Sequence, residues 1–234
     1  MSVALRDQIA IDAVGVARRF GARWVLRGVD LQVRPGEMVG LLGANGSGKS
    51  TLLRILGTLL KPSAGGATVY GHDVVKSPDD VRRQIGFLAH TPGLYDDLTA
   101  RENLQFAASM LGLENAKLDE ALDRVGLGGV RNERVRGFSA GMQRRLSMAR
   151  LLLRNARVLL LDEPYSNLDV AGISLMNELI GESVKGGGAA LVVLHELAPA
   201  AAVLDRTVTI REGRIDEPEG AALDAANFAV AGEG

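Results

Sequence analysis

Residues 43–51 read GANGSGKST, a match to the pattern G-x-x-x-x-G-K-[ST]. The match lies between MVGLL (38–42), an apolar run typical of a buried parallel strand, and a segment from Lys49 to Leu60 whose leucines have helical spacing. Glycines let backbone N–H groups surround phosphate oxygens, the Lys49 charge reaches the terminal phosphates, and the Ser50 hydroxyl can bind Mg²⁺. Because both flanks are correct, we prefer a nucleoside triphosphate site over a glycine-rich turn that merely precedes a helix. The predicted nucleotide-binding residues are Gly43, Ala44, Asn45, Gly46, Ser47, Gly48, Lys49, Ser50 and Thr51.

The segments around this motif predict an α/β fold. Alternating residues from Ile9 to Arg34 predict antiparallel strands joined near Gly21, whereas VLLLD (158–162) and ALVVL (190–194) predict buried strands. Near the end, TVTIREGRI predicts a hairpin that turns at Glu212-Gly213. The region between about 79 and 157 is mostly helical in pattern, with a capping box at Thr99–Glu102.

We call the predicted phosphate-binding loop at 43–51 the P-loop. The sequence therefore predicts a P-loop core with an antiparallel β subdomain and an inserted α-helical subdomain. We expect a single domain over residues 1–218, with the insertion at about 79–157 and an Ala-rich tail at 219–234.

Composition narrows the function. The chain of 234 residues is 47% hydrophobic and 24% charged, which is typical of a globular protein with a sizeable core. A net charge of −1 gives no overall attraction to nucleic acid or to anionic lipid, and the absence of cysteine excludes disulfides and thiolate metal sites. No run approaches the roughly 18 apolar residues that cross a bilayer, so we expect membrane contact only through a partner.

Polar residues follow two of the predicted buried strands. Asp162 and Glu163 end VLLLDEP (158–164), and His195 follows ALVVL. Ligands of open α/β sheets bind at the carboxyl ends of strands, so these side chains are expected to face the P-loop. We expect Asp162 to hold Mg²⁺ and Glu163 to polarise the attacking water. A lone histidine after a strand is usually structural, but here His195 is expected to contact the γ-phosphate, and Lys49, Glu163 and His195 are the predicted catalytic residues.

Five motifs in order resemble the ATP-binding cassette ATPases over about residues 9 to 216. They are the P-loop, FSAGM (138–142), VLLLDEP, SNLD (166–169) and His195. The resemblance implies an ATPase that uses ATP and Mg²⁺ and forms a head-to-tail homodimer around two nucleotides. It also implies transmembrane subunits as partners and a peripheral position on the cytoplasmic face of the membrane.

The same resemblance assigns further residues. Phe20 matches the aromatic that stacks on adenine, which is usually tyrosine, and no N-K-x-D run for guanine is present. Ser139 and Gly141 match the signature residues that contact the γ-phosphate of the other subunit's ATP, and Asp169 matches the aspartate that links the two sites. The signature departs from the commonest LSGGQ at Ala140 and at Met142, which cannot make the polar contacts of glutamine.

A larger departure lies in IGFLAHTPGLYDDLTARENL (85–104), where most of the family has glutamine in place of His90. This run resembles the ATP-binding subunit of the haem exporter of bacterial cytochrome c maturation. It makes His90 a further candidate beside Ser50 and Asp162 for the Mg²⁺ shell, and a link to the membrane partner. The alternative is a local polar substitution at His90 that does not indicate this subfamily.

Arginines at 131, 134, 136, 144, 145, 150, 154 and 157 invite a nucleic-acid interpretation. No aromatic residues are interleaved with them for base stacking, so we predict a solvated helix face and no nucleic-acid partner. A soluble ATPase acting on ribosomes or DNA is disfavoured, because such relatives carry two cassettes or long coiled-coil insertions. Among exporters, a drug or lipid exporter is the alternative to haem, since the cassette does not touch the cargo.

Overall fold

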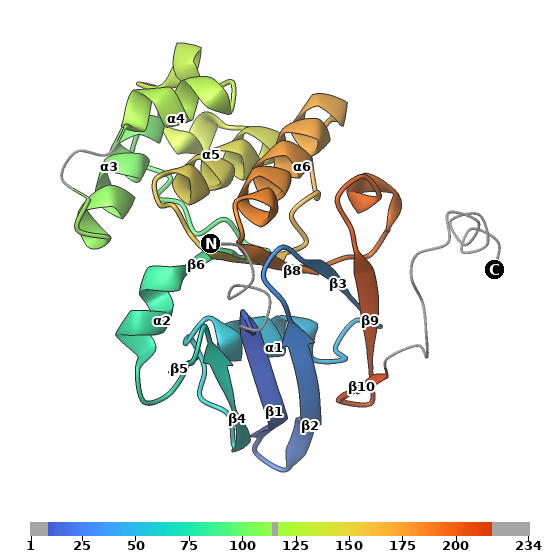
Figure 1. Ribbon diagram of the computed structural model, residues 1–234. Coiled ribbons are helices and arrows are strands. Elements are labelled where there is room, and N and C mark those ends of the chain that lie inside the picture. Colours follow the sequence, from blue (N-terminus) through green and yellow to red (C-terminus); the bar gives the residue numbers. More distant parts are fainter. Residues whose placement is uncertain (1–8, 114–116, 217–234) are drawn as a thin grey trace. The chain divides into compact units, whose positions relative to one another are not determined.

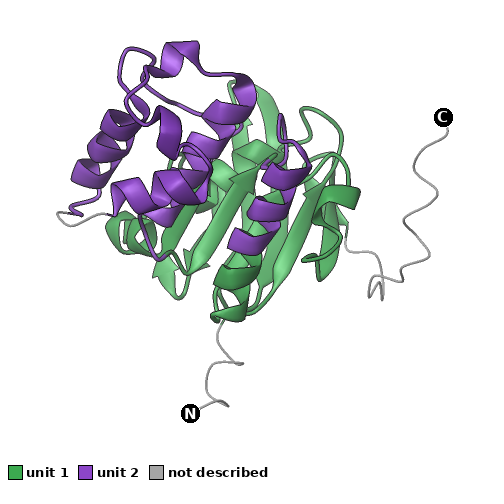
Figure 2. Cartoon of the chain, turned by 90° about the horizontal axis from the view of Figure 1, so that it is seen from above, with its two compact units in different colours: residues 1–87, 156–163, 180–234 green, residues 88–155, 164–179 purple. Residues whose placement is uncertain are grey.

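The computed structural model describes residues 9–113 and 117–216. The chain divides into two compact units, which Figure 2 shows in different colours. The first unit comprises residues 1–87, 156–163 and 180–234, and the second comprises 88–155 and 164–179. The tail expected at 219–234 lies outside the described residues.

The described residues of the first unit form two sheets (Figure 1). One has the order β2-β1-β4-β5, with antiparallel pairing throughout. Its strands are β1 (Ile11–Phe20), β2 (Arg23–Val33), β4 (Ala64–Val69) and β5 (His72–Asp73). The predicted antiparallel hairpin joined near Gly21 is therefore confirmed.

The second sheet has the order β10-β9-β3-β8-β7-β6. Strand β3 pairs in parallel with both β8 and β9, and β7 pairs in parallel with β8. Its strands are β3 (Met38–Leu42), β6 (Ile85–Leu88), β7 (Val158–Asp162), β8 (Ala189–Val193), β9 (Arg206–Arg211) and β10 (Arg214–Asp216). Every residue of β7 and β8 is buried, as expected for parallel strands covered on both faces. Strand β6 was missed, because it falls where the sequence pattern is mostly helical.

Turn chemistry determines two boundaries in this unit. The β9–β10 hairpin turns at Glu212-Gly213, as predicted, and both residues have positive φ, as a two-residue type I′ turn requires. Helix α1 (Lys49–Leu56) ends four residues before the predicted Leu60. It stops because Gly57 is followed by Thr58 in the left-handed region, and the N–H groups of residues 59 and 60 both return to the Arg54 carbonyl.

The structure has further helices besides α1, among them those of the second unit. They are α2 (Pro78–Gln84), α3 (Ala100–Met110), α4 (Leu118–Arg124), α5 (Ala140–Leu152) and α6 (Val170–Lys185), with short 3₁₀ turns at Gly128–Val130, Val135–Gly137 and Ala198–Ala200. Helix α4 contacts both α3 and α5. The capping box is present as predicted: the Thr99 hydroxyl accepts from the Glu102 N–H, and the Glu102 carboxylate accepts from the Thr99 N–H. Within the described ranges no helix is long and apolar enough to cross a membrane.

Candidate functional site

The loop between β3 and α1 has a backbone that requires glycine. Gly43, Gly46 and Gly48 all have φ between +76° and +143°. A Cβ at Gly43 would lie 2.5 Å from the Ile210 carbonyl oxygen, and one at Gly48 would lie 2.6 Å from Leu26 Cδ2. At Gly46 no atom lies within 4 Å of the Cβ position, so this part of the loop is open. The loop therefore presents backbone on one side and packs against the core on the other.

Lys49 points its charge back into this loop. Its ammonium donates to the carbonyls of Gly43, at 2.6 Å, and Ala44, at 3.1 Å, and the residue is buried. Helix α1 begins at Lys49 and has no acidic residue in its first turn, so the positive end of its dipole is not offset. The Ser47 hydroxyl is buried with no hydrogen-bond partner among the described residues. A lysine, a helix N-terminus and an unpaired hydroxyl form a site for an anion.

Strand order brings the second group of predicted residues to the same edge of the sheet. The P-loop follows β3, His195 comes two residues after β8, and Asp162 ends β7, with β8 between the other two. Strand β8 pairs in parallel with both β3 and β7, so the carboxyl ends of the three strands lie at one edge of the sheet. The expectation from the sequence that these residues share an edge agrees with this topology.

Glu163 and His195, 32 residues apart, are in direct contact. The Nε2 atom of His195 lies 2.6 Å from Glu163 Oε1, and the Glu163 N–H donates to the Val193 carbonyl. The Glu163 side chain is 21% exposed and that of His195 46%, so both reach solvent. Glu163 has φ +52°, a conformation that is strained for a residue with a Cβ and that often marks functional sites. The pair is a carboxylate with one oxygen held by an imidazole.

Asp162 is the buried acid of this edge. It is 3% exposed, and its Oδ1 atom has no hydrogen-bond partner in the part of the chain that the structure describes. A buried carboxylate without a partner is costly unless a cation compensates it. With the Ser50 hydroxyl, Asp162 offers the hard oxygen ligands that Mg²⁺ prefers. The described residues contain no cluster of three or more His, Cys, Asp or Glu.

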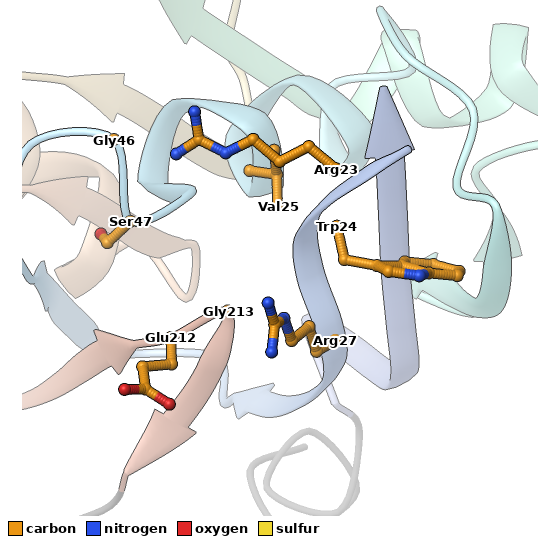
Figure 3. Close-up of a pocket in the computed structure, with 8 residues that line it drawn as sticks. All are labelled: Arg23, Trp24, Val25, Arg27, Gly46, Ser47, Glu212 and Gly213. Atoms are coloured by element: carbon orange, nitrogen blue, oxygen red, sulfur yellow. The ribbon is translucent and has the colours of Figure 1, made fainter. Parts of the chain in front are cut away.

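A pocket of about 460 Å³ lies beside the P-loop. Its walls are residues of β2, the loop and the β9–β10 turn: Arg23, Trp24, Val25, Arg27, Gly46, Ser47, Glu212 and Gly213. In Figure 3 the side chains of Arg23 and Arg27 extend toward the loop and the turn, whereas the Trp24 ring points away. The pocket is therefore polar, with two guanidinium groups and one carboxylate.

Phe20 ends β1 directly opposite Arg23, its partner in the β1–β2 ladder. Directly opposed residues of an antiparallel pair project from the same face, so the Phe20 side chain lies on the Arg23 face of the hairpin. Phe20 is 48% exposed, which leaves ring surface available for a ligand.

The remaining predicted residues belong to the second unit. Ser139 caps α5, and its hydroxyl accepts from the Met142 N–H at 3.3 Å. A Cβ at Gly141 would lie 2.9 Å from the Asn167 carbonyl oxygen, so a larger residue does not fit. Asp169 Oδ1 accepts from the Gly172 N–H at 2.9 Å and from Arg145 at 2.6 Å, and these bonds lower the pKa of Asp169.

The prediction of a solvated arginine face is wrong for α5. Arg144 is 2% exposed and donates to the carbonyls of Ala89 and His90. Arg150 donates to the Gly93 and Pro92 carbonyls, and burial lowers its pKa. Arg144 and Arg150 thus fix the backbone of residues 89–93, which includes the exposed His90. The sequence signal was their interleaving with apolar residues, which places them on the packed side of the helix.

The similarity to a known protein family decides which class of protein this chain belongs to. The model of the ABC transporter family matches residues 26–166, which include the P-loop, the Ser139 region and Asp162-Glu163. The chain belongs to the ABC transporter family. It is an ATPase subunit of an ABC transporter, as the resemblance of its motifs implied.

Two ABC transporter relatives and one solved structure show the range of similarity. The chain is 39% identical to the cytochrome c biogenesis ATP-binding export protein CcmA 2 of Cupriavidus metallidurans, over 83% of this chain and 95% of the relative. It is also 39% identical to the daunorubicin resistance ATP-binding protein DrrA3 of Streptomyces coeruleorubidus, over 88% of this chain and 66% of the relative. A dimeric ATP-binding cassette in a post-hydrolysis state, bound to ADP and Pi, has a TM-score of 0.76 and 26% identity over 88% of this chain and 97% of that one. These similarities confirm the expected fold class.

Proposed function

We propose that this ABC ATPase drives an exporter that handles haem for cytochrome c maturation, as a head-to-tail homodimer around two MgATP. The observation that carries the haem assignment is the run HTPGLY…LTARENL around His90, together with the near full-length match to a cytochrome c biogenesis export protein. The exporter's membrane subunits are the proposed partners, and the ATPase lies on the cytoplasmic face of the membrane.

In each composite site the P-loop of one copy binds the nucleotide phosphates. Backbone N–H groups of residues 43–51 and the Lys49 ammonium hold the β- and γ-phosphates, and Lys49 exchanges its bonds to the Gly43 and Ala44 carbonyls for bonds to phosphate oxygens. Ser50 and Asp162 hold Mg²⁺, which neutralises phosphate charge when bound. Asp162 Oδ1 has no hydrogen-bond partner among the described residues, which supports this role.

Glu163 is the proposed general base. His195 Nε2 engages Oε1, so the carboxylate is held at this edge of the sheet, where it can accept a proton from the attacking water. The water oxygen forms a bond to the γ-phosphorus, the bond between that phosphorus and the bridging oxygen of ADP breaks, and Glu163 takes the water proton. His195 orients Glu163, and from the same edge of the sheet it contacts the γ-phosphate.

The base end of the nucleotide lies on the β1–β2 hairpin. Phe20 stacks on adenine, and Arg23, its partner in the β1–β2 ladder, lines the pocket beside the P-loop. Stacking on an exposed aromatic ring suits a site that must release its nucleotide in each cycle.

Ser139 and Gly141 of the opposite copy contact the γ-phosphate, and Asp169 links the two sites. Helix α5 begins at the Ser139 cap and has no acidic residue in its first turn, so its N-terminus suits an anion. The similar solved cassette is dimeric, which supports the arrangement. The test mixes Lys49→Ala protein with Ser139→Arg protein, since each variant alone lacks a complete site. Recovery of ATP-dependent dimerisation on size exclusion supports shared sites, and a mixture no better than its components contradicts them.

His90 transmits the nucleotide state to the membrane subunits in this proposal. Arg144 and Arg150 tie the backbone around His90 to α5, the helix that Ser139 caps, so a shift of that helix moves the His90 segment with it. An imidazole can interact through both nitrogens at once, which suits a relay. We expect His90→Ala to keep ATP binding while uncoupling hydrolysis from the membrane partner.

The haem assignment is tested in cells. Strains with a deletion, Lys49→Ala or His90→Ala are grown under conditions that require c-type cytochromes, and covalent haem is detected by haem staining of separated proteins. Loss of staining in the deletion and Lys49→Ala strains, restored by the wild-type gene, supports the proposal. Normal c-type cytochromes in the deletion strain contradict it.

The alternative is the ATPase of a drug or lipid exporter. The equal identity to a daunorubicin resistance protein favours this candidate. It predicts normal haem staining with raised sensitivity to an exported compound in the same deletion strain, while the ATPase mechanism stays unchanged.

A further inference from the structure

Arg18 lies against the ring that we propose as the platform for adenine. Its guanidinium carbon is 4.7 Å from the centroid of the Phe20 ring, within the range of a cation–π contact. The two residues are two positions apart on β1, so their side chains project from the same face of the strand. One side of the Phe20 ring is therefore covered, while the residue as a whole stays 48% exposed.

Arg18 is itself anchored to a second segment. Its NH1 group donates to the Lys61 carbonyl at 3.0 Å. Next to it, the Ser63 N–H donates to the Ala17 carbonyl at 2.7 Å, and the Arg19 N–H donates to the Ser63 hydroxyl at 3.2 Å. These bonds tie the end of β1 to residues 61–63, which follow the helix that starts at the P-loop. The base platform and the phosphate loop are thus joined through one short segment.

The position of Arg18 has a cost. Its Nε atom is buried with no hydrogen-bond partner among residues 9–113 and 117–216. A buried donor without a partner is unfavourable, so the ring contact and the Lys61 bond have to offset it. Phe20, unlike a tyrosine at this place, has no hydroxyl whose hydrogen bond could fix the ring. The group in contact with the ring is Arg18.

We infer that Arg18 is a positioning residue that holds the Phe20 ring ready to stack on the nucleotide base. The inference rests on the proposed role of Phe20. Holding the ring before binding lowers the entropy lost when the base stacks on it, so Arg18 raises affinity for nucleotides that carry a base. It makes no difference to ligands that consist of phosphate alone.

Arg19 is a matched control. It is the next residue on the same strand, and its guanidinium lies 5.8 Å from the Trp24 ring centroid. Arg19 and Trp24 are partners in the ladder, and in Figure 3 the Trp24 ring points away from the P-loop. Arg19→Ala therefore removes the same charge and a similar contact, but on the face that does not carry Phe20.

The experiment measures dissociation constants of ADP and of inorganic pyrophosphate by calorimetry, with Mg²⁺, for full-length wild type and variants. The variants are Arg18→Ala, Arg18→Lys, Arg19→Ala, Phe20→Ala and the double variant Arg18→Ala/Phe20→Ala. We expect Arg18→Ala to weaken ADP by about 3- to 10-fold and leave pyrophosphate unchanged. Arg18→Lys should recover part of the loss, Arg19→Ala should behave as wild type, and the double variant should be no weaker than Phe20→Ala.

The outcomes separate the two claims. If Phe20→Ala weakens ADP while Arg18→Ala matches Arg19→Ala, the inference about Arg18 is wrong and the base platform stands. Equal weakening of ADP and pyrophosphate by Arg18→Ala also overturns it, because Arg18 then acts on the phosphates or on the fold. Additive losses in the double variant show independent roles and overturn it as well. If Phe20→Ala leaves ADP binding unchanged, the proposed platform fails first, and the inference fails with it.

Discussion

Replacing Glu163 by glutamine tests the proposed chemistry most directly. Glutamine has the same shape, and its amide can keep a hydrogen bond to the His195 ring that lies 2.6 Å from Oε1. The fold should therefore change in stability by less than about 1 kcal/mol. The substituted amide cannot accept the proton of the attacking water. Loss of a general base slows a reaction by about 10²- to 10⁴-fold, which corresponds to about 2.7–5.4 kcal/mol in the activation free energy.

The assay compares single-turnover ATP hydrolysis, ATP affinity and thermal unfolding for Glu163→Gln and wild type. We expect hydrolysis to fall by at least about 100-fold with affinity unchanged, and an ATP-bound dimer to accumulate on size exclusion. Glu196→Gln is the matched control, because Glu196 follows His195 directly and its side chain is exposed. Hydrolysis by Glu163→Gln near the wild-type rate would refute the reasoning, and an equal loss in Glu196→Gln would show that charge near the edge, rather than a base, is what matters.

Three further predictions follow from single contacts. Thr99→Ala removes the capping box of α3 and should lower the free energy of unfolding by about 1 kcal/mol in chemical denaturation, whereas Ser109→Ala in the same helix should change it by less than about 0.5 kcal/mol. Asp162→Asn should abolish Mg²⁺-dependent hydrolysis. It should also raise the melting temperature of the nucleotide-free protein, because it neutralises a buried carboxylate oxygen that has no partner within the described residues. A lower melting temperature would contradict this expectation. The pKa of Asp169 is lowered, first by the hydrogen bond from the Gly172 N–H and then by Arg145, so the stabilisation from this carboxylate is present above a pH of about 4 and is lost as the pH falls through the folded-state pKa. The difference in unfolding midpoint between wild type and Asp169→Asn should therefore shrink below about pH 4. A difference that stays constant with pH would argue against these bonds.

The sequence alone predicted features that depend on neighbours along the chain. The P-loop needs only a strand, glycines that can adopt positive φ and a helix start, and all three lie within residues 38–56. The same holds for the capping box at Thr99 and for the hairpin at Glu212-Gly213, where local side chains and turn geometry determine the backbone. The buried strands β7 and β8 were predicted for a related reason, since a short run that is wholly apolar can only be covered on both faces.

Only the tertiary structure decided which distant groups meet and which charges are buried. Strand order places the ends of β7 and β8 next to each other, and this brings His195 within 2.6 Å of Glu163 across 32 residues. Packing also reversed the interpretation of two α5 arginines. Arg144 is buried and Arg150 is half-buried, because the carbonyls of residues 89–93 accept their hydrogen bonds, and nothing in the local pattern identifies those acceptors. Likewise, the burial of Asp162 Oδ1 without a partner among the described residues and the stacking of Arg18 on Phe20 depend on what surrounds each side chain in space. Propensity and periodicity act over a few residues, whereas burial and pairing are set by segments far apart in the chain, which is why the motifs were predictable and the contacts among them were not.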